Sequence, residues 1–466
     1  MQFRIEDCLN QSKMTYYLVH ALLIGALIGF FIVQNNPFLI FFAFFLSIRL
    51  LIFYNPNTSF YIILLSVFFI DWLRDMNLIS SQFTLLPDVI LAVLAIKVLL
   101  LKVRDRKLVR TPIDIPILLY LFFGIVSTLI NGQHPITTLV GFRFDLKYVF
   151  MFYLIVQLGP DGRFFKRMFV FLVVLLLVQV PVAVVKYFIY GQGEQAIGTY
   201  AYQTGILSTV LPLVAISIFI GLYFYHKTSV YYIVGCLLFF LFSIIGGKRG
   251  FLFFAIALTL FLGWQVGLKN LVKVYILAPF FIFGFAATIY LVPDLRPAFE
   301  DPLYLINWSV SYETMQSKDD GAAAGRTAAF MKTNEILIKN ISTLLVGFGP
   351  GSISQSFFQK YKGRLEDKIP IVYGRSQWVT MSLEEGYIGV GLFIWSFVLF
   401  FKVANAVHEK IEDSFFKAIA FGFKGIVFSF LICMNYGVIF RMDVSGFIFW
   451  FLAAAVFSIG KQNHLL

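Results

Sequence analysis

Long apolar runs separated by short polar segments dominate the chain along its whole length. Most are long enough to supply the roughly 20 residues that a helix needs to cross the hydrocarbon of a bilayer. Continuous runs predict helices, because the strands of a membrane barrel would alternate polar and apolar residues. The fourteen runs are Tyr17–Val33, Phe38–Phe53, Phe60–Ile70, Pro87–Leu101, Ile113–Ile130, Ile136–Val156, Met168–Tyr190, Tyr202–Tyr225, Val230–Ile245, Phe251–Val266, Leu271–Val292, Leu383–Phe401, Phe415–Phe440 and Val444–Ile459.

This pattern predicts an all-α fold, a polytopic transmembrane helical bundle of 12–14 spans. The range reflects the short runs Phe60–Ile70 and Pro87–Leu101, which suit re-entrant or broken helices. One long polar stretch divides the chain into a bundle over residues 1–292, a loop subdomain over 293–382 and C-terminal helices over 383–466. Within the loop, apolar residues at helical spacing predict a helix over Gly325–Asn340, so the loop is expected to be partly helical.

The composition excludes a soluble globular protein. Of the 466 residues, 59% are hydrophobic and 13% are charged, whereas soluble domains have about 25% charged residues. The net charge of +12 fits basic cytoplasmic loops and contact with membrane lipid, and we expect no nucleic acid partner. The three cysteines and five histidines have no metal-ligand spacing, so we expect neither a metal nor another cofactor.

Loop charge predicts the orientation. The densest short basic segment, residues 102–110, is placed in the cytoplasm by the rule that lysine and arginine accumulate on that side. Counting spans in both directions then puts the remaining basic loops inside. Both termini come out cytoplasmic, and the long loop over residues 293–382 lies outside.

Two charged groups break the pattern of the spans around them. Lys248 and Arg249 lie between glycines at the outer end of a span, where they either snorkel to the interface or clamp a phosphate. Arg143, Asp145 and Lys147 lie inside an apolar run. Charges there are costly, so these three either hold helices together or line a polar cleft that is reached from outside.

The long loop adds two arginines, Arg326 and Arg375. Each can be read as a solvated surface charge. Their neighbours favour a site, because Arg326 follows a run of alanine and glycine, and Arg375 precedes Ser376 just before the chain re-enters the membrane. Arginine binds phosphate through two parallel hydrogen bonds, which makes both residues candidates for contact with a diphosphate.

Four motifs now stand in a recognisable order. They are GGKRGFLFFAIAL at Gly246–Leu258, Gly325-Arg326, VGFGPG at Val346–Gly351, and Glu384-x-Gly386-x-x-Gly389. In this order the second half of the chain, from Gly246 to about Phe393, resembles the O-antigen ligase/polymerase superfamily of integral-membrane glycan transferases. The first half is similar to that superfamily only as a string of spans.

The resemblance implies a metal-independent glycosyltransferase. Its donor would be an oligosaccharide linked to a polyprenyl diphosphate, such as undecaprenyl diphosphate. Its acceptor would be a second glycan. Arg249 and Arg326 match arginines that contact diphosphate or glycan, and Glu384 and Gly386 match the acid and glycine of the re-entry. Arg375 and Ser376 stand where the ligase branch has histidine and asparagine, with Arg375 eleven residues before Gly386, as in the arginine-containing loops of polymerases.

The resemblance therefore favours a polymerase of polysaccharide repeat units in a bacterial inner membrane, for cell-envelope synthesis, with a flippase and a chain-length regulator as further partners. The predicted catalytic residues are Arg249, Arg326, Arg375 and Glu384, with Glu385 or Asp145 as alternatives to Glu384 for taking the proton of the acceptor. The predicted substrate-binding residues are Arg143, Asp145, Lys147, Lys248, Ser376 and Gly386.

Three alternatives remain open from the sequence. A ligase would transfer finished glycan to lipid A core or protein. A polysaccharide or lipid transporter would also suit charges inside spans and interrupted helices, although no internal repeat relates the two halves. A structural or sensor membrane protein leaves the charges of residues 143–147 unexplained.

Overall fold

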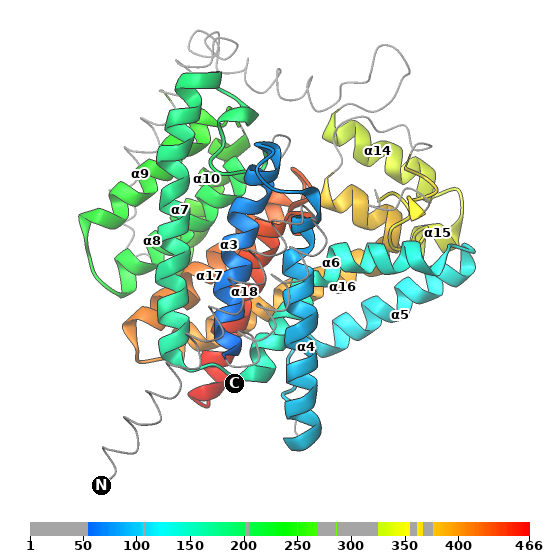
Figure 1. The fold of residues 1–466 in the computed structure, drawn as a ribbon, viewed down its shortest axis with the longest axis horizontal. Coiled ribbons are helices and arrows are strands. Elements are labelled where there is room, and N and C mark those ends of the chain that lie inside the picture. Colours follow the sequence, from blue (N-terminus) through cyan, green and yellow to red (C-terminus); the bar gives the residue numbers. More distant parts are fainter. Residues whose placement is uncertain are drawn as a thin grey trace, which may run out of the picture. The chain divides into compact units, whose positions relative to one another are not determined.

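The computed structural model describes residues 55–105, 108–200, 205–248, 250–267, 286, 325–354, 361–366 and 376–466. Every regular element within these ranges is a helix, and Figure 1 traces the helices along the chain. Seven of the described helices are long and apolar enough to cross a membrane. The chain is therefore an all-α, multi-pass membrane protein, as the hydropathy pattern predicts.

The bounds of the helices match most of the predicted runs. Apart from residue 286, the runs Tyr17–Val33, Phe38–Phe53 and Leu271–Val292 lie outside the described residues, and each of the others falls on a helix. The helices are α3 (Pro56–Asp75), η1 (Ser81–Leu85), α4 (Leu86–Asp105), α5 (Asp114–Ile130), α6 (Pro135–Leu158), α7 (Gly162–Tyr190), η2 (Glu194–Ala196), α8 (Leu207–Tyr225), α9 (Val230–Ile245), α10 (Gly250–Val266), α14 (Arg326–Leu337), α15 (Ile341–Val346), α16 (Gln377–Lys410), α17 (Ser414–Cys433), η6 (Ile439–Arg441) and α18 (Asp443–Gln462).

The expectation of re-entrant or broken helices at Phe60–Ile70 and Pro87–Leu101 is wrong. Both runs lie inside helices of 20 residues, α3 and α4. Helical structure extends beyond the apolar run because polar residues also support it. In α3, for example, Arg74 forms an i,i+3 ion pair with Asp71 at 3.1 Å.

The chain divides into two compact units. The smaller takes in Met1–Ser66 and Gln82–Lys107, and the larger takes in Val67–Ser81 and Leu108–Leu466. All the predicted site residues belong to the larger unit.

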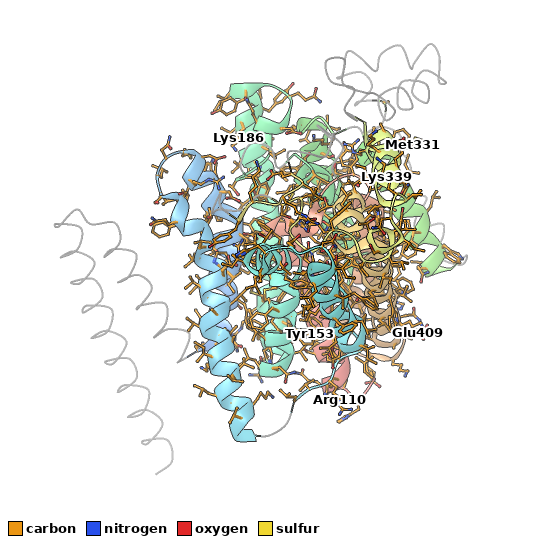
Figure 2. All side chains as sticks on the ribbon, turned by 90° about the vertical axis from the view of Figure 1, so that its right-hand side faces the viewer. Arg110, Tyr153, Lys186, Met331, Lys339 and Glu409 are labelled. Carbon is orange, nitrogen blue, oxygen red and sulfur yellow. The ribbon has the colours of Figure 1, made fainter. Side chains whose placement is uncertain are left out.

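The larger unit has two distinct ends. Figure 2 shows Arg110 and Glu409 toward one end and Lys186, Met331 and Lys339 toward the other. The first two residues come from segments that loop charge assigns to the cytoplasm, and the last three from segments that it assigns to the outside. The structure therefore separates the two predicted faces, and which of them faces the cytoplasm stays a prediction.

Small residues let the helices of the larger unit approach closely. A Cβ atom on Gly221 of α8 would lie 2.4 Å from the carbonyl oxygen of Ala418 in α17, and one on Gly422 would lie 2.9 Å from that of Ser217. Such contacts are typical of helix packing in membranes, where close backbone approach replaces the hydrophobic driving force. α18 packs against α6, α16 and α17 and is buried along nearly its whole length.

The predicted helix over Gly325–Asn340 is confirmed as α14, and the short helix α15 follows it. Helix α16 begins at Gln377, six residues earlier than the predicted start at Leu383. The Ser376 hydroxyl caps α16 by accepting a hydrogen bond from the Val379 N–H at 3.3 Å. A small apolar core holds α14 and α15 against the first turns of α16; its buried residues are Ala329, Leu337, Ile353, Val379 and Leu383.

Candidate functional site

Helix α16 is broken at Gly386, whose φ of 66° and ψ of −173° are not helical. In a regular helix, each carbonyl accepts a bond from the N–H four residues on. Here the carbonyl of Leu383 accepts instead from the Phe348 N–H at 2.8 Å, and that of Glu384 from the Gly349 N–H at 2.9 Å. A distant segment thus satisfies the groups at the break.

That segment is the turn Gly347–Gly351, which we call the glycine turn. It fits tightly on both sides. A Cβ atom on Gly347 would lie 2.5 Å from the carbonyl oxygen of Glu384, and one on Gly141 of α6 would lie 2.2 Å from the Gly351 nitrogen. Because α6 and α16 enclose the turn, these positions require glycine.

Polar side chains at the C-terminal end of α5 also hold the glycine turn. Ser127 donates a hydrogen bond to the Gly347 carbonyl at 3.0 Å, and Asn131 donates to the same carbonyl at 3.1 Å. Gln133, just after the helix, donates to the carbonyl of Pro350 at 2.5 Å. The turn is therefore fixed by backbone and side-chain bonds from two separate helices.

Next to the break lies a buried group of charges that we call the Arg441 cluster; its members are Asp145, Glu384, Glu385 and Arg441. Arg441 binds Asp145 in two-point fashion, with its Nε 2.8 Å from Oδ1 and its Nη2 3.0 Å from Oδ2. The same Nη2 donates to Glu384 Oε2. The side chains of Asp145 and Glu384 are 3% and 0% exposed, so the ion pairs are shielded from solvent.

Neutral groups complete the bonding of the two paired carboxylates. Tyr120 donates from its hydroxyl to Asp145 Oδ2 at 3.3 Å. Ser354 donates to Glu384 Oε1 at 2.7 Å, and the Ile353 N–H donates to the same oxygen at 3.2 Å. All four carboxylate oxygens of Asp145 and Glu384 therefore accept at least one hydrogen bond, as buried acceptors normally do.

The charge of Arg441 is stabilised by its neighbours. Burial lowers the pKa of this guanidinium, but the carboxylates of Asp145 and Glu384 outweigh that effect and raise the pKa well above its ordinary value.

The three carboxylates of the cluster lie close together. One oxygen each from Asp145, Glu384 and Glu385 lies within 4.8 Å of the others, close enough to surround a metal ion. Arg441 supplies a neutralising positive charge through its bonds to Asp145 and Glu384, and among the described residues neither carboxylate oxygen of Glu385 has a hydrogen-bond partner.

The other charges of α6 point to different partners. Lys147 pairs with Asp443 at the start of α18, with Nζ 2.9 Å from Oδ1, and its side chain is 7% exposed. Arg143 is half-buried, and its guanidinium lies 5.4 Å from the centre of the Phe144 ring. Lys147 thus holds the start of α18, and Asp145 the end of η6, against α6. These contacts support the helix-holding interpretation of this group, with partners that the sequence did not indicate.

A cavity of about 580 Å³ opens elsewhere in the larger unit. We call it the Arg326 cavity. Its lining residues are Phe254, Arg326, Thr327, Phe330, Trp378, Ser382, Tyr387, Val390, Asn435 and Tyr436. Among the described residues, Arg326 is a predicted arginine that lines the cavity, whereas Asp145, Glu384 and Glu385 are not among its lining residues.

Arg326 is held at the first position of α14. Its Nε donates to the Tyr436 carbonyl at 3.0 Å, and its guanidinium stacks on the Tyr436 ring at 3.8 Å from the ring centre. Phe254 of α10 meets the same ring edge-on, with ring centres 5.6 Å apart. The arginine is thereby oriented while one face of the cavity stays aromatic.

Residues 434–441, between α17 and α18, connect the cavity to the Arg441 cluster. Tyr436 lines the cavity, and Arg441 lies in the cluster five residues later. Gln377 fixes the segment between them: its N–H donates to the carbonyls of Met434 and Gly437, and its side-chain oxygen accepts from the Phe440 N–H at 3.2 Å. One short segment therefore determines the geometry of both sites.

Two of the predicted catalytic arginines, Arg249 and Arg375, lie outside the described residues. Their chain neighbours do meet at the same place. Gly250 packs on Tyr436, where an added Cβ atom would lie 2.8 Å from the ring. Gln377, which follows Ser376, bonds to Met434 of the same segment. The described residues Gly250, Arg326 and Gln377 thus all contact residues 434–437.

Lys248 and Ser376 have structural partners. Lys248 forms an ion pair with Glu194 of η2, which ties the turn before α10 to η2. Ser376 is 2% exposed and caps α16. Both contacts position the backbone beside the neighbouring predicted arginine.

Sequence reasoning missed Arg441 and Tyr436. Arg441 lies between the last two predicted runs and reads as part of a short connection, whereas Tyr436 lies near the end of the run Phe415–Phe440 and reads as part of a span. The available signal was the same one that marked Lys248 and Arg249, namely a basic residue at an end of the spans where loop charge predicts few. The buried carboxylate partners of Arg441, however, are distant in sequence, and no pattern along the chain connects them with it.

No protein-family model matches this chain, and no curated protein matches it at significant similarity.

Proposed function

We propose that the chain is a membrane glycosyltransferase that joins polyprenyl-diphosphate-linked oligosaccharide units into a longer polysaccharide. The observation that carries this proposal is the Arg326 cavity. It combines a fixed guanidinium with the rings of Tyr436, Trp378 and Tyr387 and the amide of Asn435. Arginine suits a diphosphate, and aromatic faces with a few polar groups suit a sugar.

The chemistry requires stabilisation of the departing diphosphate. Negative charge grows on its oxygens as the bond to the sugar breaks, and fixed cations aimed at those oxygens lower the barrier. Arg326 is oriented for this role by its bond to the Tyr436 carbonyl, and we propose that Arg249 and Arg375 complete the cationic group. No metal ion is needed in this scheme.

Glu384 receives a different role from the one that the resemblance implies. It is fully buried and bonded to Arg441, Ser354 and the Ile353 N–H. We assign it a positioning role, in which it holds the break in α16 and the glycine turn in place. The sequence motif around Glu384 and Gly386 is then explained by architecture.

The proposal includes the setting of the protein. We place it in the cytoplasmic membrane of a bacterium, with both termini in the cytoplasm and the Arg326 cavity open to the outer side. There it would receive substrate from a flippase and act with a chain-length regulator. A ligase in the same family is the alternative within this chemistry.

The test uses purified protein in vesicles with a lipid-linked repeat unit. A ladder of longer lipid-linked chains supports a polymerase, and transfer to a different lipid acceptor supports a ligase. Arg326→Lys keeps the charge but loses the guanidinium's planar fork, so we expect at least about a tenfold loss of rate, the equivalent of 1.36 kcal/mol. Lys332→Ala, on the same helix, is the matched control and should keep full activity. A rate unchanged by Arg326→Lys contradicts the proposal.

A transporter is the second candidate, and a specific observation favours it. Helix α16 is interrupted at Gly386 beside buried charges. Interrupted helices of this kind often form the substrate sites of transporters. Movement of a lipid-linked glycan across vesicles with no covalent product would establish that function.

A further inference from the structure

Glu385 is a buried acid with no role in the bonding described above. It is 2% exposed, and neither of its carboxylate oxygens has a hydrogen-bond partner among the described residues. Its neighbour Glu384 is bonded at both oxygens. Buried polar atoms without partners are rare in folded proteins and call for a physical explanation.

The groups around Glu385 come from four elements. Tyr120 of α5 contributes a hydroxyl, and Asp145 of α6 and Glu384 of α16 contribute carboxylates. Arg441 of η6 contributes the cation of this group among the described residues. Three ionised carboxylates would leave two negative charges without compensation in a place shielded from water. That arrangement is costly, and a carboxyl under such conditions takes up a proton instead.

The positions of the oxygens favour Glu385 as the carboxyl that takes up the proton. Arg441 and the neutral donors already bind every oxygen of Asp145 and Glu384, so only Glu385 offers free oxygens. One of them lies within 4.8 Å of an oxygen of Asp145. A protonated carboxyl is a hydrogen-bond donor, which an ionised one is not. Two carboxyls close together then share one proton.

We propose that Glu385 is a proton-binding site, held as the neutral acid at neutral pH with its O–H directed at the carboxylate of Asp145. The proton comes from water and returns to water, so no other reactant is involved. In the sequence, Glu385 directly precedes the break at Gly386. It stands between Ser382 and Tyr387, two residues that line the Arg326 cavity. Proton loss therefore adds a negative charge at the point where α16, the glycine turn and Arg441 meet.

Infrared spectroscopy of the purified protein tests this proposal, and it needs no glycan substrate, so its outcome is independent of the proposed function. A neutral carboxyl has a C=O stretching band that an ionised carboxylate lacks. We expect this band in the wild-type protein at neutral pH and its loss in Glu385→Gln. Glu409→Gln, an exposed change on the same helix, should keep the band. A band that is unchanged in Glu385→Gln overturns the proposal.

Thermal unfolding as a function of pH gives a second readout. A group that is protonated in the folded chain and ionised in the unfolded chain makes stability fall as pH rises. The wild-type protein and Glu409→Gln should show this decline in stability. Glu385→Gln should lack the part of the decline that comes from deprotonation of Glu385. Equal pH dependence in the three proteins contradicts the proposal. Failure of Glu385→Gln to fold contradicts it too, because glutamine has the shape of the neutral acid.

Discussion

Arg441 organises residues that lie far apart in the sequence. Its guanidinium reaches Asp145 of α6, Glu384 of α16 and Ser354 after the glycine turn. Each contact alone is an ordinary hydrogen bond or ion pair. Because all of them are buried, loss of the one cation leaves two carboxylates without compensation, which costs far more than the contacts themselves contribute.

We therefore predict that Arg441→Met lowers the free energy of unfolding by about 3–5 kcal/mol, the usual cost of breaking a buried ion pair. Thermal unfolding of the detergent-purified protein measures the change. Arg163→Met, at an exposed position, should leave stability within about 0.5 kcal/mol of the wild type.

A triple variant separates charge from shape. Adding Asp145→Asn and Glu384→Gln to Arg441→Met removes the uncompensated charges, and most of the lost stability should return. A triple variant as unstable as the single one would show that the cluster acts through packing and not through charge.

At the scale of elements, the break in α16 depends on one residue. Gly386 has a positive φ, and a Cβ atom there would lie 2.4 Å from the carbonyl oxygen of Leu345. We predict that Gly386→Ala reduces the yield of folded protein and displaces the glycine turn. Size-exclusion chromatography and thermal unfolding measure this.

Gly391 provides the matched control on the same helix. A Cβ atom there meets nothing within 4 Å, and alanine is the better helix former by about 1 kcal/mol. Gly391→Ala should therefore be neutral or stabilising. Equal behaviour of the two alanine variants would mean that the break is not required for folding.

The start of α17 offers a prediction about pH. Asp413 caps the helix by accepting from the Phe415 N–H at 2.9 Å, and it pairs with Lys166 of α7 at 2.8 Å. Burial acts to raise the pKa of Asp413, but the bonds from Lys166 and from the N–H groups of Phe416 and Phe415 outweigh it and lower the pKa. The stabilisation is therefore present above about pH 3.9 and is lost as pH falls through the lowered value.

Asp413→Ala should cost about 1 kcal/mol at neutral pH, the usual value of a helix cap. The difference in unfolding temperature from the wild type should shrink in acid. Glu412→Ala changes an exposed neighbour and should have little effect at any pH. A difference that grows in acid would exclude the ionised cap as its source.

At the scale of the whole molecule, the two ends of the larger unit can be assigned to sides of the membrane. We predict that a cysteine at Lys339 reacts with a membrane-impermeant reagent in intact cells, whereas a cysteine at Arg110 reacts only after the membrane is opened. The physical reason is the accumulation of lysine and arginine in cytoplasmic loops. Labelling with the opposite pattern would invert the topology, and labelling of both positions would refute it.

The sequence predicted the motifs of the site better than their roles. The order of the glycine turn, Glu384 and Gly386 marked them as related, and the structure places them in contact. Asp145 was recognised as a costly charge inside a span, but its partner is Arg441 and not a neighbour on α6. Pairing of this kind depends on helix packing, which leaves no periodic signal along the chain.

The sequence by itself determined that this is an all-α membrane protein, because apolar runs of this length have few other ways to satisfy their backbone groups in a bilayer. It also located most helices, including α14. Tertiary structure alone decided which charges neutralise one another, which residues face the Arg326 cavity and which buried acid, Glu385, has carboxylate oxygens that accept no hydrogen bond from the described residues. These properties depend on distances between helices, and such distances are set by side-chain packing across the whole larger unit.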